Sequence, residues 1–162
     1  MALTKVIGAG IGTVTNQFAD ANMSAGSIIQ IVQASTTTET STTSTSFTDS
    51  GLTASITPSS TSSKIFILYF LHQFINGAGG SSNIKLLRGS TDLQSTGYMA
   101  YNGGSNVMGL GAHHYLDSPS TTSSTTYKVQ FTSVSSSIGV FCNYDDSAGD
   151  GSSFITLMEI AQ

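Results

Sequence analysis

The sequence is poor in charge, cysteine, proline and tryptophan. Charged residues make up 9% of the 162 residues, whereas about 25% is usual in a soluble domain. Five of them are Lys or Arg, too few for the clustered basic surface with which proteins neutralise nucleic-acid phosphates. The single cysteine, Cys142, excludes an internal disulfide and therefore a small secreted module held together by disulfides.

Long apolar segments are missing as well. The longest apolar run, Ile65 to Leu71, is far shorter than the ~20 residues of a membrane-spanning helix. The first twelve residues lack the continuous apolar stretch of a secretory signal. We therefore expect synthesis in a cytoplasm and no membrane insertion. The net charge of −4 also argues against nucleic acid and anionic membranes as partners.

Hydroxyl side chains are abundant instead. The chain holds 28 Ser and 22 Thr, close to a third of its residues, together with 38% apolar residues. That apolar content is enough to build a core and argues against a disordered chain. A neutral, hydroxyl-rich surface is more typical of proteins that join assemblies or face the outside world than of free enzymes, and we expect this protein to belong to the former group.

Two regions differ in character. Residues 1–26 contain Gly8, Gly10 and Gly12 and show neither helical nor strand periodicity. We predict an extended arm that docks on another protein; a frayed terminus is the alternative. Residues 27–162 show short β-rich segments separated by turn residues, with no stretch that predicts a helix. This pattern predicts one all-β domain, an antiparallel sandwich.

The expected strands are short and regularly spaced. The run 35–46 is low in complexity and is a candidate edge strand, and Asp49 to Gly51 is interpreted as a turn within the next segment. The strand segments are 27–34, 47–56, 64–75, 84–88, 98–101, 107–116, 126–132, 138–144 and 153–160.

Two of these segments are apolar on both faces. In a monomeric β-sandwich, apolar and polar residues usually alternate along a strand. Tyr127, Val129 and Phe131 alternate in this way with Lys128 and Gln130. In segments 64–75 and 153–160, both faces of the strand carry large apolar side chains. The first has Ile65, Ile67, Tyr69 and Leu71 on one face and Phe66, Leu68 and Phe70 on the other, and the second has Ile155 and Leu157 against Phe154, Met158 and Ile160.

One apolar face can supply the core, but the other needs cover, and no helix is expected to provide it. A neighbouring copy of the chain is the simplest cover, because exposed apolar surface on several strands would promote aggregation. A loop of the same chain is the alternative. The candidate subunit-interface residues are Phe66, Leu68, Phe70, Ile155 and Leu157.

Patterns that suggest catalysis or metal binding are incomplete. The glycines at 8–12 lack the third glycine of a dinucleotide loop, since Thr13 stands there. His113 and His114 are adjacent on a predicted strand, so they should point to opposite faces and not share a metal ion. The acidic loop 145–151 breaks the calcium-loop pattern at Ala148 and Leu157. We expect no enzyme activity, no cofactor and no metal site.

Three tyrosines near Gly- and Asn-rich loops are candidate ligand residues. Tyr98, Tyr101 and Tyr144 lie where exposed aromatic rings could stack on sugar rings. A weak site for a host surface glycan is therefore one hypothesis. Packing of these rings in the core or at an interface is the simpler alternative.

Several stretches resemble one known family. They are GSIIQIVQA at 26–34, TSTSFTDSGLTASITPSSTSSKIFILYFLHQF at 43–74, KLLRGST at 85–91 and SFITLMEIAQ at 153–162. Together they resemble a domain of tail-fibre and other virion structural proteins of tailed phages that infect aquatic bacteria. The segment LTKVIGAGIG at 3–12 is similar to short attachment segments of such fibres.

The resemblance implies a jelly-roll domain similar to tumour-necrosis-factor and complement-type trimers. On this basis residues 1–26 would attach to other virion proteins and residues 27–162 would form a homotrimer. The expected protein is a short tail fibre or tail-associated adhesion module of a virion, made in the bacterial cytoplasm. A capsid decoration or head-fibre protein is the alternative. The chain lacks the long shaft that such fibres usually carry, which argues against a far-reaching receptor-binding fibre. An enzyme that degrades surface polysaccharide is a distant third.

Overall fold

A computed structural model of the chain describes residues 23–97, 101–144 and 151–162, and this part of the chain contains strands but no helix. The predicted all-β sandwich is therefore confirmed. Most of the predicted arm, residues 1–22, lies outside the described residues. The strands are β1 (Ile28–Thr36), β2 (Thr40–Thr42), β3 (Thr48–Ile56), β4 (Lys64–Asn76), β5 (Gly80–Arg88), β6 (Thr91–Thr96), β7 (Tyr101–Asn102), β8 (Val107–Asp117), β9 (Thr125–Ser133), β10 (Gly139–Cys142) and β11 (Ser153–Ile160).

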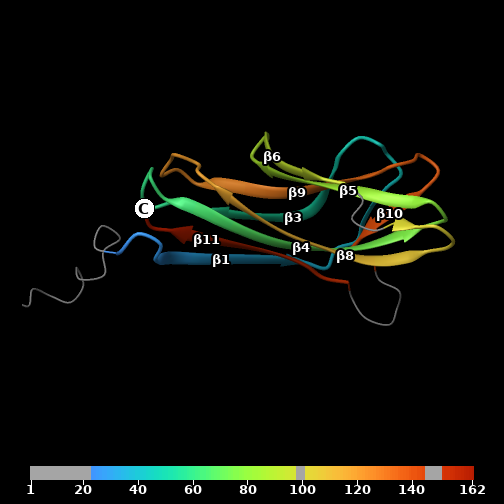
Figure 1. The fold of residues 1–162 in the computed structure, drawn as a ribbon, viewed down its shortest axis with the longest axis horizontal. Coiled ribbons are helices and arrows are strands. Elements are labelled where there is room, and N and C mark those ends of the chain that lie inside the picture. Colours follow the sequence, from blue (N-terminus) through green and yellow to red (C-terminus); the bar gives the residue numbers. More distant parts are fainter. Residues whose placement is uncertain (1–22, 98–100, 145–150) are drawn as a thin grey trace, which may run out of the picture.

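The strands form two antiparallel sheets that lie one above the other, in a jelly-roll-like arrangement (Figure 1). One sheet has the order β1-β11-β4-β10-β2, with β8 on the other side of β4. The other has the order β3-β9-β5-β6, and the short β7 pairs with the start of β5. We call them the β4 sheet and the β9 sheet.

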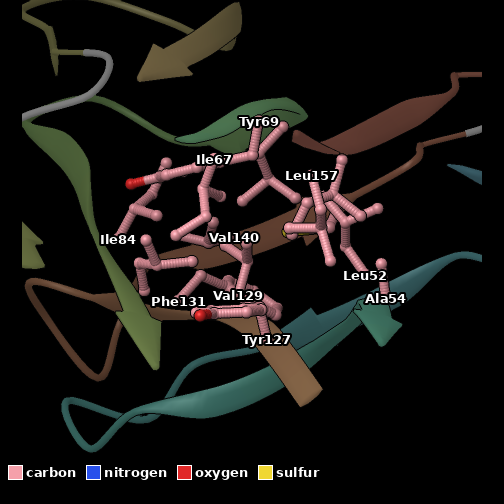
Figure 2. Packing of buried hydrophobic residues seen from close by; sticks show 14 of the residues in the cluster. Leu52, Ala54, Ile67, Tyr69, Ile84, Tyr127, Val129, Phe131, Val140 and Leu157 are labelled. Carbon is pink, nitrogen blue, oxygen red and sulfur yellow. The ribbon is translucent and has the colours of Figure 1, made fainter. Parts of the chain in front are cut away.

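The core lies between the two sheets. Side chains such as Ile67 and Leu157 from the β4 sheet meet Val129 and Phe131 from the β9 sheet (Figure 2). Each of these four side chains is fully buried. They come from alternate positions, because successive side chains of a strand point to opposite faces. The predicted alternation of Tyr127, Val129 and Phe131 is confirmed.

β3 departs from the predicted pattern. The residues interpreted as a turn, Asp49 to Gly51, lie within a continuous strand, and the pairing with β9 shifts register there. Gly51 adopts a left-handed φ of 81°, as the extra residue of a bulge often does. The Ser50 hydroxyl donates to the Val129 carbonyl at 2.7 Å and accepts from the Leu52 amide. A bulge uses the same residue types as a turn, so the sequence pattern alone did not separate the two.

Two strands extend beyond or outside the predicted segments. β5 begins at Gly80, inside a stretch that predicted a turn, and β6 was not predicted at all. β6 consists mainly of polar residues on the edge of the β9 sheet. Such a strand forms by pairing with its neighbour and carries little apolar alternation of its own.

A buried ionic cluster ties the two sheets together. Asp117, at the end of β8, is 5% exposed. Its carboxylate accepts from the Tyr127 hydroxyl at 2.7 Å and from Arg88 Nη1 at 2.8 Å, and both partners lie in the β9 sheet. Burial and the neighbouring carboxylate raise the pKa of Tyr127, so it stays protonated and donates.

Within the described ranges, the structure holds no helix long and apolar enough to cross a membrane.

Candidate functional site: an exposed apolar face

The outward side of the β4 sheet carries large apolar side chains. Leu68 is 45% exposed in the middle of β4, and Leu110 on the neighbouring β8 is 57% exposed. Lys64, at one end of β4, is the one charged residue at the outward positions of these three strands in the described part of the chain. We call this surface the apolar face and define it by the outward residues of β4, β8 and β11, which are Phe66, Leu68, Phe70, His72, Phe74, Met108, Leu110, Ala112, His114, Leu116, Phe154, Thr156, Met158 and Ile160.

Strand register arranges these residues in rows across the sheet. One row runs from Leu116 through Phe66 to Met158, and continues to Ile31 on β1. The next runs from His114 through Leu68 to Thr156 and on to Gln33. Opposite residues on antiparallel strands lie about 4.5–5.5 Å apart, so each row is a contiguous strip. The face is thus most apolar over β4 and β8 and becomes more polar towards β1.

An aromatic cluster lies at one end of the apolar face. Phe74 stacks on Tyr144 with their ring centroids 4.2 Å apart, and Phe141 of β10 packs edge-on against Tyr144 at 5.6 Å. Phe74 and Phe141 are also paired across β4 and β10. The cluster extends the apolar face beyond its three strands with further neutral ring surface.

The outward side of the β9 sheet has a different composition. Lys128 and Asp49 form an ion pair at 3.0 Å, and Lys85 and Asp92 form another at 2.7 Å. Lys85 also lies 4.2 Å from the centre of the Phe47 ring. Hydrogen bonding from Gln130, together with Lys128, holds the pKa of Asp49 below its ordinary value. This side has the charge expected of a surface that faces water.

The structure separates the five predicted interface residues into two groups. Phe66, Leu68 and Phe70 lie on the apolar face, with Leu68 the most exposed of them. Ile155 and Leu157 are fully buried in the core, opposite Tyr69 and Ile67 on β4. The prediction that Ile155 and Leu157 line a subunit interface is therefore wrong, because β11 points its other side outward.

Glu159 lies on the inward side of β11, together with Ile155 and Leu157. Its carboxylate is buried on the inward side of β11, where Ser59 donates to it from both its amide and its hydroxyl at 2.7 and 2.6 Å. Gln30 donates from β1 at 2.6 Å. Burial alone would raise the pKa of Glu159, but these hydrogen bonds outweigh it and hold the pKa below its ordinary value of 4.5. The charge is thus accommodated inside, at the end of the sandwich.

His113 and His114 lie on opposite sides of the β4 sheet. His114 lies against Phe66 at 5.8 Å between ring centroids, and His113 lies against Tyr69 on the other side of the sheet at 5.7 Å. Their predicted opposite orientation is confirmed. Burial, and then the neighbouring His114, lower the pKa of His113. Across the described ranges no three His, Cys, Asp or Glu residues are grouped to hold a metal ion. The acidic residues 145–150 lie outside those ranges.

The two described candidate sugar-binding tyrosines lie next to different sheets. Tyr101 is 65% exposed on β7, which pairs with β5. Tyr144 instead packs against Phe74 and Phe141, next to the other sheet. Tyr98 lies outside the described residues. Packing accounts for Tyr144, and Tyr101 is the described member of the set that offers a free ring.

The described surface includes at least two cavities. One, of about 330 Å³, lies at the end of the sandwich and is lined by serines of the 59–63 loop with Met23 and Ile29. The other, of about 250 Å³, lies at the β3 bulge beside Asp49 and Lys128. Neither lining includes a histidine or a cysteine. Cys142 is buried elsewhere, and burial raises the pKa of its thiol to about 12, so it remains a neutral thiol.

Sequence reasoning missed half of the apolar face. Met108, Leu110 and Leu116 alternate along β8 with the smaller or buried Gly109, Gly111 and Asp117. That alternation could have identified them as one face of a strand. The sequence does not say that this face points away from the core, because Val107 and Tyr115 on the other side are also apolar.

The chain matches no protein-family model, and a comparison with curated proteins also finds no match.

Proposed function

We propose that this protein is a non-enzymatic structural component of a phage virion, in which the β-sandwich assembles into a homotrimer. Residues 1–26 would attach it to other virion proteins. The observation that carries the proposal is the apolar face, a neutral surface of Phe, Leu and Met side chains on a domain whose opposite side is charged. The family resemblance supplies the virion and the copy number of three.

Burial of the apolar face supplies the energy of assembly. Complete burial of one Leu, Met or Phe side chain contributes roughly 1.5–3 kcal/mol relative to exposure. Leu68, Leu110, Met108 and Leu116 are each about half exposed in the single chain. Their burial between copies, together with the phenylalanines around them, gives several kcal/mol per contact before the cost of association. A monomer would leave the same surface as an aggregation hazard.

A structural role also suits the rest of the surface. The loops are rich in Ser and Thr, and many of their hydroxyls bond to nearby residues of the same loop, as Ser60 does with Ser62. Such loops are uncharged, and their hydroxyl groups find hydrogen-bond partners within the same loop. Display of several copies would allow a weak outward-facing contact, such as one made by Tyr101, to gain avidity.

Location on the particle tests the proposal. Antibodies against the sandwich, carrying an electron-dense label, would be applied to intact particles produced with the wild-type chain. We expect label at the tail, which the short tail fibre or adhesion module requires. Label on the head alone would favour the capsid decoration alternative, and absence of the protein from purified particles would overturn the virion role.

A matched pair of variants links that result to the apolar face. Leu68→Asp places a charge in the middle of the face, and Thr126→Asp places the same charge on the exposed side of the β9 sheet. We expect Leu68→Asp chains to be lost from particles and Thr126→Asp chains to be retained. Equal incorporation of both variants would show that the face does not carry assembly.

A further inference from the structure

Among the described strands, β8 lies at an edge of the β4 sheet. It pairs with β4 along all eleven residues, from Asp117 opposite Ile65 to Val107 opposite Ile75, without a register shift. No described strand pairs with its other side. A strand in this position presents a row of backbone N–H and C=O groups, and the natural ligand of such a row is another extended strand.

β8 lacks the features that usually protect an edge. It contains no proline and no lysine, and its one acidic residue, Asp117, is buried and bound to Arg88. The other edges are blunted. β2 has three residues, and both β1 and β3 have a register shift where they pair with their inner neighbours. β6, at the remaining edge, bears Asp92 in an ion pair. Of the described edges, β8 is thus the longest and the most regular.

The β8 sequence is complementary to itself. Antiparallel pairing centred on Ala112 uses all eleven residues and keeps the outward positions on one side. The outward partners are then Met108 with Leu116 and Leu110 with His114.

On the inward side small residues meet large ones in the same register. Gly109 stands opposite Tyr115 and Gly111 opposite His113, so each ring has room beside a residue without a side chain. Opposite side chains on paired strands are in contact, and here no pair is bulky on both sides.

We infer that two copies of this chain join through β8, in antiparallel register about a two-fold axis at Ala112, so that the β4 sheets form one continuous sheet. The inference deepens the proposed self-assembly and rests on it for the biological setting, but the contact joins two strands edge to edge through their backbone groups and does not pack one apolar face against another. A two-fold contact of this kind is closed by itself. The smallest closed assembly that uses it together with a three-fold contact holds six copies.

Thiol cross-linking of the full chain tests the register. Ala112→Cys places exposed thiols opposite each other on the axis, and Ser35→Cys is the control in the same row of the sheet. Across the joined sheet the two Ser35 positions are seven strand spacings apart, about 34 Å at ~4.8 Å each. The native Cys142 is buried and does not compete. With a short bifunctional thiol reagent we expect most Ala112→Cys chains to become covalent dimers and Ser35→Cys chains to stay uncoupled.

A mixing experiment guards against a misfolded variant. Leu110→Cys and His114→Cys chains, mixed after separate purification, should form mixed dimers in higher yield than either variant forms alone, since these positions face each other. Equal yields for the mixture and the single variants, or dimers of Ala112→Cys no more abundant than those of Ser35→Cys, would overturn the β8 register. Cross-linking to a protein other than this chain would do so as well.

The outcomes separate this inference from the proposed function. A stable trimer without β8 cross-links would overturn the edge contact and leave the apolar-face proposal standing. Cross-linked dimers from a chain that is absent from purified particles would support the edge contact and overturn the virion role. Adding Leu68→Asp to Ala112→Cys gives a further check, because the β8 cross-link should persist when packing of the face is lost.

Discussion

The two sheets of the sandwich share one core but carry opposite outer surfaces. The β9 sheet faces outward with Lys85, Asp92, Asp49 and Lys128 in two ion pairs, whereas the β4 sheet faces outward with phenylalanine, leucine and methionine. Both sheets have the same strand geometry and the same inward alternation, so the fold does not require this difference. Under the proposed function, the charged side faces water and the apolar side packs against other copies of the chain.

The largest effect should come from the inward side of the β4 sheet. Leu157→Ala removes a fully buried side chain from the core, and such changes destabilise by about 2–5 kcal/mol. Leu68→Ala, one strand away but outward, should alter the unfolding free energy of the protomer by only about 0.5 kcal/mol. Urea unfolding over a range of protein concentrations measures both.

Concentration dependence is the informative part of that experiment. The urea concentration at the unfolding midpoint of an assembled protein rises with protein concentration. Leu68→Ala should weaken this dependence, because it weakens assembly. Leu157→Ala should lower the unfolding midpoint at every protein concentration. If the two variants lose the same unfolding free energy in dilute protein, the inward and outward sides of the β4 sheet do not differ as described.

The next effect concerns the carboxylate that the β4 sheet keeps inside. Glu159→Gln replaces an acceptor of three hydrogen bonds with a group that turns an N–H towards Ser59 or Gln30. Loss of hydrogen bonds to a buried charged group costs about 1–3 kcal/mol. We expect that loss at neutral pH, measured by urea unfolding.

The pH dependence of the Glu159→Gln effect follows from the lowered pKa. A carboxyl group whose pKa is lower in the folded than in the unfolded chain stabilises the fold above its unfolded pKa, and this contribution disappears as pH falls through the folded value. The difference between wild type and Glu159→Gln should therefore be constant above about pH 5, near the ordinary carboxyl pKa, and shrink below it. If the difference in unfolding free energy between wild type and Glu159→Gln grows as the pH falls, the pKa of Glu159 is not lowered by folding.

The smallest effect should come from the charged face. Lys128→Gln removes the ion pair with Asp49, while Gln130 still donates to that carboxylate. Exposed ion pairs contribute about 0.2–1 kcal/mol, and added salt should reduce the difference further. Thermal unfolding at two salt concentrations measures it. If Lys128→Gln lowers the unfolding free energy as much as Leu157→Ala does, the outward side of the β9 sheet is not a simple hydrated surface.

Much of the fold could be predicted, because most strands carry their own alternation. β9 alternates polar and apolar residues from Thr126 to Phe131, and β4 is long and apolar with turn residues at both ends. The bulge at Gly51 and the polar β6 could not be predicted with the same means. Their positions depend on pairing with neighbouring strands, which a single strand's sequence does not record.

The apolar face was half predicted for a related reason. On β4 the two sides were separated correctly, but on β11 the sides were exchanged. Glu159 shares its side with Ile155 and Leu157, and a carboxylate normally marks the side that faces water. Here Ser59 and Gln30 satisfy it inside the protein. Those partners lie 100 and 129 residues away in the chain, so no local pattern could reveal them.

The mass of the protein in solution tests the central claim most directly. Light scattering after gel filtration would compare the wild type with Leu68→Asp and with the control Thr126→Asp. We predict three chains of 16.7 kDa, or a multiple of three, for the wild type and the control, and a smaller species for Leu68→Asp. A wild-type protein that stays at 16.7 kDa and remains in solution at high concentration would contradict the claim that copies of the chain cover the apolar face.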